Sequence, residues 1–287
     1  MANLKEIRNR IASVKSTMQI TSAMKMVSAA KLKKAQDAIV AMRPYSQKLT
    51  ELISNLNASV SDDSDFGAYS KQRLVKKILA VAISSNRGLC GAFNSNIIKA
   101  AKNVAIEADA AVQVEFFAMG KRGAENLRKT NSLVGTNNQI FDALNFENAA
   151  VIAQELMEMF VSGKYDKILL IYNHFKNAAN QDVLVEQFLP ILPPSAKSVK
   201  ETDYIYEPGK VEILSALIPK SLKLQLYKAL RDSYASEHGA RMTSMHKATD
   251  NAGELRDQLT INYNKARQAA ITNEILEIVS GAEALKG

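Results

Sequence analysis

The chain of 287 residues has no tryptophan, six prolines, twelve glycines and a single cysteine, Cys90. One cysteine cannot form an intramolecular disulfide, which favours a reducing compartment. Aromatic residues make up only 6% of the chain, a composition that suits long helices rich in alanine and leucine. The N-terminus has no apolar run typical of a signal peptide, and runs such as residues 78–83 are far shorter than a membrane span. We therefore expect any membrane attachment to be through partners.

The scarcity of proline and glycine permits a very long helix at the C-terminus. No proline follows Pro219, and only four glycines do. Because proline is the residue that interrupts a helix most strongly, one helix can run from Lys220 to Lys286. At about 1.5 Å per residue it would be roughly 100 Å long. A helix of this length is expected to pair with another helix or to pass through a partner.

A second long helix is predicted over the first fifty-odd residues, which contain no glycine. A 4-3 spacing typical of a coiled-coil seam runs through Leu4, Ile7, Ile11, Val14, Met18, Thr21, Lys25, Ser28, Leu32, Ala35, Ile39 and Met42. Where the seam is polar, the apolar stripe shifts to Ile20, Met24 and Val27. Pro44 is expected to bend or interrupt the helix, with a second segment reaching about Asn57.

The C-terminal helix has a seam with the same spacing but dominated by alanine: Arg241, Met245, Ala248, Ala252, Leu255, Leu259, Asn262, Ala266, Ala269, Asn273 and Leu276. Both helices flank one central segment, so if they pair they pair antiparallel. Counting outward from that segment places Met24 level with Arg241. The C-terminal helix is the longer one, and its last twenty or so residues are expected to project alone. A plain coiled-coil spacer is the alternative interpretation of this pattern.

The middle of the chain predicts an α/β domain. Buried strands are expected at residues 77–84, 112–118, 167–172 and 183–189, with helices near 93–108, after Gly120 and at 148–161. Alternating strands and helices favour a mostly parallel, Rossmann-like sheet with helices on both faces. The predicted fold class is thus α/β plus a long antiparallel coiled coil. The expected domains are 1–57, 58–207 and 208–287.

Few residues suggest chemistry. The segment Arg87-Gly88-Leu89-Cys90-Gly91 follows a strand, but it lacks both the dinucleotide and the phosphate-loop spacing, and a tight structural turn is the better account of its glycines. The three histidines have no nearby cysteine or acidic cluster, so a metal site is not expected. We expect no catalytic site and no cofactor.

The basic charge lies mainly on the N-terminal helix. Residues 1–57 hold ten Lys/Arg against three Asp/Glu, out of a net charge of +8 for the chain. Such a surface could serve an acidic protein partner or nucleic acid, or simply be solvated. A basic coiled-coil protein that binds nucleic acid, or an adaptor, is therefore the alternative function. The basic helices lack the interleaved aromatic residues that single-stranded nucleic-acid binding favours.

Segments at both ends resemble the gamma subunit of F-type ATP synthases. The stretch Ile271-Thr272-Asn273-Glu274, followed by Ile278-Val279-Ser280-Gly281-Ala282, is similar to the C-terminal signature of that family. Further similar stretches are 236–242, 248–252 and 263–268, and at the N-terminus 5–8, 20–24 and 26–31. The match at 86–91 is to a segment that is structural in the family.

The resemblance implies a non-catalytic rotor subunit of a proton-translocating complex. Its coiled coil would turn inside three alpha and three beta subunits, and its α/β domain would lie against the epsilon subunit and the c-ring, with no nucleic-acid partner. Location would be peripheral, at the cytoplasmic face of the bacterial inner membrane. The resemblance assigns rotor–stator contacts to Met24, Lys25, Arg241 and Met242. It assigns a C-terminal bearing to Leu276, Ile278, Val279 and Leu285, and a foot contact with epsilon and the c-ring to Tyr204 and Tyr206. From the residues alone, the two tyrosines could equally seal the edge of the domain.

Overall fold

The computed structural model describes residues 4–58, 69–130, 132–178, 180–191, 207 and 209–284. The chain forms two compact units. One comprises the described parts of Met1–Ser28 and Met242–Gly287, and the other comprises those of Ala29–Arg241. Two long helices, α1 (Leu4–Ala58) and α5 (Lys210–Ala284), each contribute to both units.

The larger unit contains a five-stranded sheet in the order β3-β2-β1-β4-β5. Four strands run parallel, and β5 pairs with β4 antiparallel, which confirms the predicted mostly parallel sheet with intervening helices. Along the chain the elements are β1 (Lys77–Ile83), α2 (Phe93–Glu107), β2 (Gln113–Met119), α3 (Lys121–Leu127), η2 (Arg128–Thr130), β3 (Leu133–Asn137), η3 (Gln139–Phe141), α4 (Phe146–Val161), β4 (Lys167–Phe175) and β5 (Gln181–Leu189).

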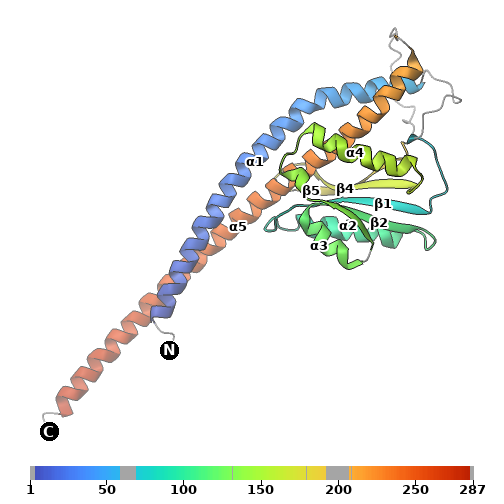
Figure 1. Cartoon of the computed structure of the whole chain (residues 1–287). Coiled ribbons are helices and arrows are strands. Elements are labelled where there is room, and N and C mark those ends of the chain that lie inside the picture. Colours follow the sequence, from blue (N-terminus) through green and yellow to red (C-terminus); the bar gives the residue numbers. More distant parts are fainter. Residues whose placement is uncertain are drawn as a thin grey trace. The chain divides into compact units, whose positions relative to one another are not determined.

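Both faces of the sheet are buried, because successive side chains of a strand point to opposite faces. On β1, Leu79, Val81 and Ile83 pack against α4 and the first turns of α5. Ala80 and Ala82 pack on the other face, against α2 and α3. Figure 1 shows α4 on one side of the strands and α2 with α3 on the other. The continuous apolar run of β1 is thus explained by burial on both sides.

One strand of the sheet, β3, was not predicted. It has five residues, two of them polar, and contains Gly135, so its sequence carries little β signal. The glycine is required by packing, because a Cβ there would lie 2.7 Å from the ring of Phe117 on the neighbouring strand. A contact of this kind can be recognised only once the strands are paired.

In the smaller unit α1 and α5 lie side by side and antiparallel (Figure 1). The predicted seam of α1 is confirmed there, since its positions from Leu4 to Ser28 are all buried or half-buried. The predicted shift of the stripe is wrong. Thr21 and Ser28 are buried, whereas Ile20 and Val27 are each 57% exposed. The buried hydroxyls are tolerated because they donate to backbone carbonyls of their own helix.

The seam of α5 differs from the prediction in its second half. Five predicted positions are exposed: Leu255, Asn262, Ala269, Asn273 and Leu276. A seam of the same 4-3 spacing instead follows the buried or half-buried residues Met245, Thr249, Ala252, Arg256, Leu259, Tyr263, Ala266 and Ala270. Two side-chain hydrogen bonds fix this register.

Those two bonds also set the level of the helices. The Arg8 guanidinium donates to the Tyr263 hydroxyl at 2.7 Å, and the hydroxyls of Thr21 and Thr249 lie 2.8 Å apart. Continuing the same antiparallel register places Met24 near the level of His246, not level with Arg241 as predicted. Counting residues from the ends of the central segment gives the wrong level because the register does not depend on where the helices begin. It is set by the side chains that pack between them.

Neither proline inside a long helix ends it. Pro44 lies within α1 and Pro219 within α5. Of the two effects predicted for Pro44, bending or interruption, the helix is not interrupted, and its second half is bent (Figure 1). Each proline removes one intrahelical hydrogen bond. Burial of neighbouring residues such as Leu49 and Ile218 offsets that loss.

Candidate functional site

The carboxyl ends of β1 and β4 are the place where a sheet of this order is expected to bind a ligand. β1 continues into α2 on one face of the sheet, while the helix that precedes β4 lies on the other, so the two strands meet at a topological switch point. In this chain α5 occupies that place. The Ser233 hydroxyl donates to the Ile83 carbonyl at 3.4 Å, and the Ser236 hydroxyl donates to the Asn173 carbonyl at 3.0 Å.

Small residues let α5 approach the strand ends closely. Ser236 and Ala240 are buried, and Gly239 lies between them. A Cβ at Gly239 would lie 3.3 Å from the Ala178 Cα and 3.3 Å from the Phe175 ring. Glycine here lowers helix propensity by about 1 kcal/mol relative to alanine, and the contact explains why it is present.

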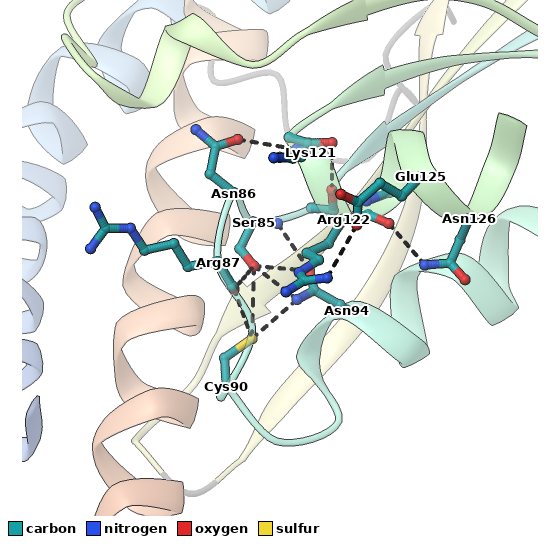
Figure 2. Close-up of polar contacts among 12 residues, drawn as sticks. Ser85, Asn86, Arg87, Cys90, Asn94, Lys121, Arg122, Glu125 and Asn126 are labelled. Atoms are coloured by element: carbon teal, nitrogen blue, oxygen red, sulfur yellow. Dashed lines mark hydrogen bonds and ion pairs between the residues drawn. The ribbon is translucent and has the colours of Figure 1, made fainter. Parts of the chain in front are cut away.

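The turn after β1, residues 85–91, is held by a network of its own side chains (Figure 2). The Ser85 hydroxyl donates to the Arg87 carbonyl at 2.6 Å, and the Ser85 amide donates to the Asn94 side chain at 3.0 Å. The Asn94 side chain also donates to the Cys90 sulfur at 3.2 Å. Cys90 is buried, and burial is the main cause that raises the pKa of its thiol. The thiol therefore fills the turn as a protonated, packed group.

Arg241 of α5 holds the same turn from the other side. Its guanidinium contacts Glu237 at 2.5 Å, one helical turn earlier, and donates to the carbonyls of Arg87 at 3.0 Å and Gly88 at 3.3 Å. Arg241 is only 6% exposed. Burial raises the pKa of Glu237, and the neighbouring Arg241 opposes that rise. The arrangement joins one helix to one turn through a buried charged pair.

His238 lies beside this pair and is buried. Burial lowers the pKa of His238 from 6.5 to about 3, with Arg241 and Lys31 acting in the same direction, so its ring is neutral near pH 7. The ring meets that of Tyr234 edge to face, with centroids 4.5 Å apart. Among the described residues, no hydrogen-bond partner reaches its Nδ1 atom.

The predicted rotor–stator residues have different environments. Met24, Lys25 and Met242 are half-buried in the smaller unit, whereas Arg241 is buried in the larger one. Of the predicted bearing, Leu276, Ile278 and Val279 are exposed on α5. Leu285 and the predicted foot residues Tyr204 and Tyr206 lie outside the described residues.

Sequence reasoning missed the link between Arg241 and the turn. The spacing of Glu237 and Arg241, four residues apart on a helix, indicates an ion pair and was the available signal. The two carbonyl acceptors could not be found from sequence because they lie about 150 residues earlier in the chain.

Two other features are absent from the residues that the structure describes. No group of three or more His, Cys, Asp or Glu side chains there is arranged to hold a metal ion. None of the described helices combines the length and apolar character that crossing a membrane requires.

Comparison with known proteins gives matches along nearly the whole chain. The family model described as ATP synthase matches residues 3–285. The ATP synthase gamma chain of Flavobacterium psychrophilum is 67% identical, over 100% of both chains.

Solved structures give the same result for the fold. A chain of the Tetrahymena thermophila mitochondrial ATP synthase central stalk and c-ring structure is 30% identical with a TM-score of 0.59, covering 80% of this chain and 99% of that one. A chain of the Euglena gracilis mitochondrial ATP synthase has a TM-score of 0.71 at 20% identity, covering 98% and 94%, which supports the fold alone. The resemblance seen in the sequence is confirmed, and the chain belongs to the ATP synthase gamma chain family.

Proposed function

We propose that this chain is the central-stalk rotor subunit of a proton-translocating ATP synthase, without a catalytic site of its own. It couples rotation of a c-ring to conformational cycling of catalytic beta subunits, and in reverse it couples ATP hydrolysis to proton pumping. The geometry that supports this function best is the end of α5. From Ile271 to Ala284 the helix continues with every residue exposed.

The exposed end of α5 carries apolar side chains that a helix in water would not normally display. Ile271, Ile275, Leu276, Ile278 and Val279 are each about half exposed or more. A helix with apolar residues on several sides is typical of one enclosed by other protein. We assign Leu276, Ile278 and Val279, with Leu285 beyond them, to a bearing formed by the alpha and beta subunits.

We place the rotor–stator contact on Met24, Lys25 and Met242. Next to Met24 and Lys25, the exposed Ile20 and Val27 add apolar surface on α1. A protein partner with an acidic, apolar surface matches this combination of lysine, methionine and aliphatic side chains. Because Arg241 is buried and its guanidinium already has three acceptors, we give it a role inside the chain instead of a direct stator contact.

The proposed assembly contains three alpha, three beta and one copy of this chain, with an epsilon subunit and a c-ring at its base. Tyr204 and Tyr206 remain our candidates for the contact with epsilon and the c-ring. Association with the c-ring would hold the chain at the cytoplasmic face of the bacterial inner membrane, peripherally. Each rotational step would bias the beta subunits because the contacted surface differs from one side of the shaft to the other.

The test is co-expression of this chain with the alpha and beta subunits of the same organism. We expect a complex of three alpha, three beta and one of this chain, whose ATP hydrolysis depends on the chain. Lys25→Glu should lower that hydrolysis by reversing a contact charge. Lys15→Glu, a change at an exposed lysine on the same helix, is the matched control. A folded chain that never joins the alpha and beta subunits would refute the proposal.

A further inference from the structure

We propose that Arg241 is a positioning residue that fastens the 85–91 turn to α5, so that the turn and the helix segment 233–241 move as one body. The proposal goes beyond the rotor function, since the fastening is a property of the chain alone. Its role in transmitting torque rests on the proposed function.

The acceptors around the Arg241 guanidinium come from both the helix and the turn. One nitrogen, Nη1, contacts Glu237 on α5, and the other, Nη2, reaches the Arg87 and Gly88 carbonyls in the turn. A buried guanidinium is costly unless its donors are satisfied and its charge is balanced. Glu237 supplies the balancing charge, and the turn supplies the remaining acceptors. Displacing the turn would therefore leave a buried cation short of acceptors.

The backbone of the turn is strained at Leu89, between the residues that Arg241 and α5 hold. Leu89 has a φ of 62°, in the left-handed region that leucine rarely adopts. Its side chain is 65% exposed, so burial of the leucine does not compensate for this conformation. Such a residue persists when its surroundings fix it. The carbonyls just before Leu89 are the two held by Arg241, and Cys90, just after it, packs with Phe93 and Ala240.

The contacts at position 241 require the shape of an arginine side chain. A planar guanidinium can donate from two nitrogens in different directions at once, which the ammonium of lysine cannot reproduce in the same geometry. Lysine at this position could pair with Glu237 or reach the turn, but it could not satisfy both. The contact thus depends on arginine itself and not only on positive charge.

Cys90 provides a reporter for the test because it is the one cysteine of the chain and is buried in the turn. The rate at which a water-soluble disulfide reagent modifies Cys90 in the folded full-length chain measures opening of the turn. We expect Arg241→Gln to raise this rate at least tenfold and Arg241→Lys to raise it less, with unchanged helical circular dichroism. The control is Arg231→Gln, because Arg231 on the same helix donates to the Tyr227 hydroxyl instead of to the turn. The control should label within twofold of the wild-type rate.

A folded Arg241→Gln variant that labels at the wild-type rate would overturn the proposal. If that variant does not fold, native-state hydrogen exchange of the wild-type chain decides. The Ser85 and Phe93 amides, which donate to Asn94 and Cys90, should then share the protection of the α5 amides at 233–240. If the Ser85 and Phe93 amides exchange as fast as those of exposed loops while the α5 amides stay protected, the fastening of the turn to α5 is contradicted.

The torque role has a separate measurement in the assembled, membrane-bound complex. Arg241→Gln should lower the number of protons pumped per ATP hydrolysed, whereas Arg231→Gln should not. If Arg241→Gln labels fast at Cys90 but pumps the wild-type number of protons per ATP, the torque role is refuted and the fastening of the turn is supported. Failure of the wild-type chain to assemble would instead count against the proposed function, since the labelling result does not depend on assembly.

Discussion

Gly239 and Gly253 are two glycines inside the same helix with opposite surroundings. A Cβ at Gly253 would meet nothing within 4 Å, whereas one at Gly239 would press on the Ala178 backbone. We expect Gly253→Ala to raise the free energy of unfolding by up to about 1 kcal/mol, the gain in helix propensity. Gly239→Ala should be neutral or destabilising, because Ala178 would have to move. Urea unfolding of both variants is the measurement, and equal stabilisation by the two would contradict the packing argument.

The buried His238 is expected to make the folded chain less stable at acid pH. Its pKa in the folded chain is lowered to about 3 from 6.5. Between these two values His238 is protonated in the unfolded chain but neutral in the folded chain. The stability linked to this histidine is therefore complete above that pH and is lost as the pH falls toward 3. At pH 5 the loss should be about 2 kcal/mol.

The variant His238→Phe keeps the ring and removes this titration. Urea unfolding at pH 7 and pH 5 should show a smaller acid loss in the variant than in the wild type. His246→Gln, which replaces an exposed histidine on the same helix, should retain the wild-type loss. Identical acid losses in wild type and His238→Phe would show that another group is responsible.

At the scale of the elements, the pairing of α1 and α5 in the smaller unit includes the contact between Thr21 and Thr249. Each hydroxyl has one proton, so in this contact one threonine donates to the other, which donates to a carbonyl of its own helix. Removing one hydroxyl therefore leaves the other with a carbonyl acceptor on its own helix. We expect Thr21→Val and Thr249→Val to cost about 0.5–1.5 kcal/mol each. The double variant should cost less than the two together, which a double-mutant cycle measures.

The control for this cycle is Thr17→Val. Thr17 is exposed, and its hydroxyl donates to the Ser13 carbonyl within α1, so its loss should cost less than either seam change. Strict additivity of the two seam variants would mean that the hydroxyl contact does not contribute to the pairing.

The sequence predicted the seam of α1 better than the seam of α5. Isoleucine and leucine at 4-3 spacing identified the seam of α1 because large aliphatic side chains mark one side clearly. In α5 alanine occurs on every side, and the real seam contains Arg256 and Tyr263, which no apolar pattern would select. The spacing of Glu237 and Arg241 was visible in the sequence, but the burial of Arg241 was not, because its two carbonyl acceptors come from a turn distant in the chain.

At the scale of the whole molecule, we expect the end of α5 to contribute to assembly but not to the stability of the isolated chain. Deleting residues 271–287 removes no described side chain that is buried. We therefore expect the thermal midpoint of the isolated chain to change by no more than about 2 °C, since surface changes away from packed groups are usually small. Affinity for the alpha and beta subunits should fall, as measured by equilibrium binding. A large drop in the midpoint would show that this end is packed in the isolated chain.

The position of α5 over the ends of β1 and β4 has a further consequence. Segment 233–241 stands where a separate small molecule binds in other sheets of this order, and it behaves as a ligand that is covalently tethered to its receptor. A tether converts association into an intramolecular step with an effective concentration in the millimolar range or above. Contacts of only modest intrinsic affinity then keep the place filled at any dilution of the protein. The ends of β1 and β4 are therefore permanently occupied by a segment of the chain itself.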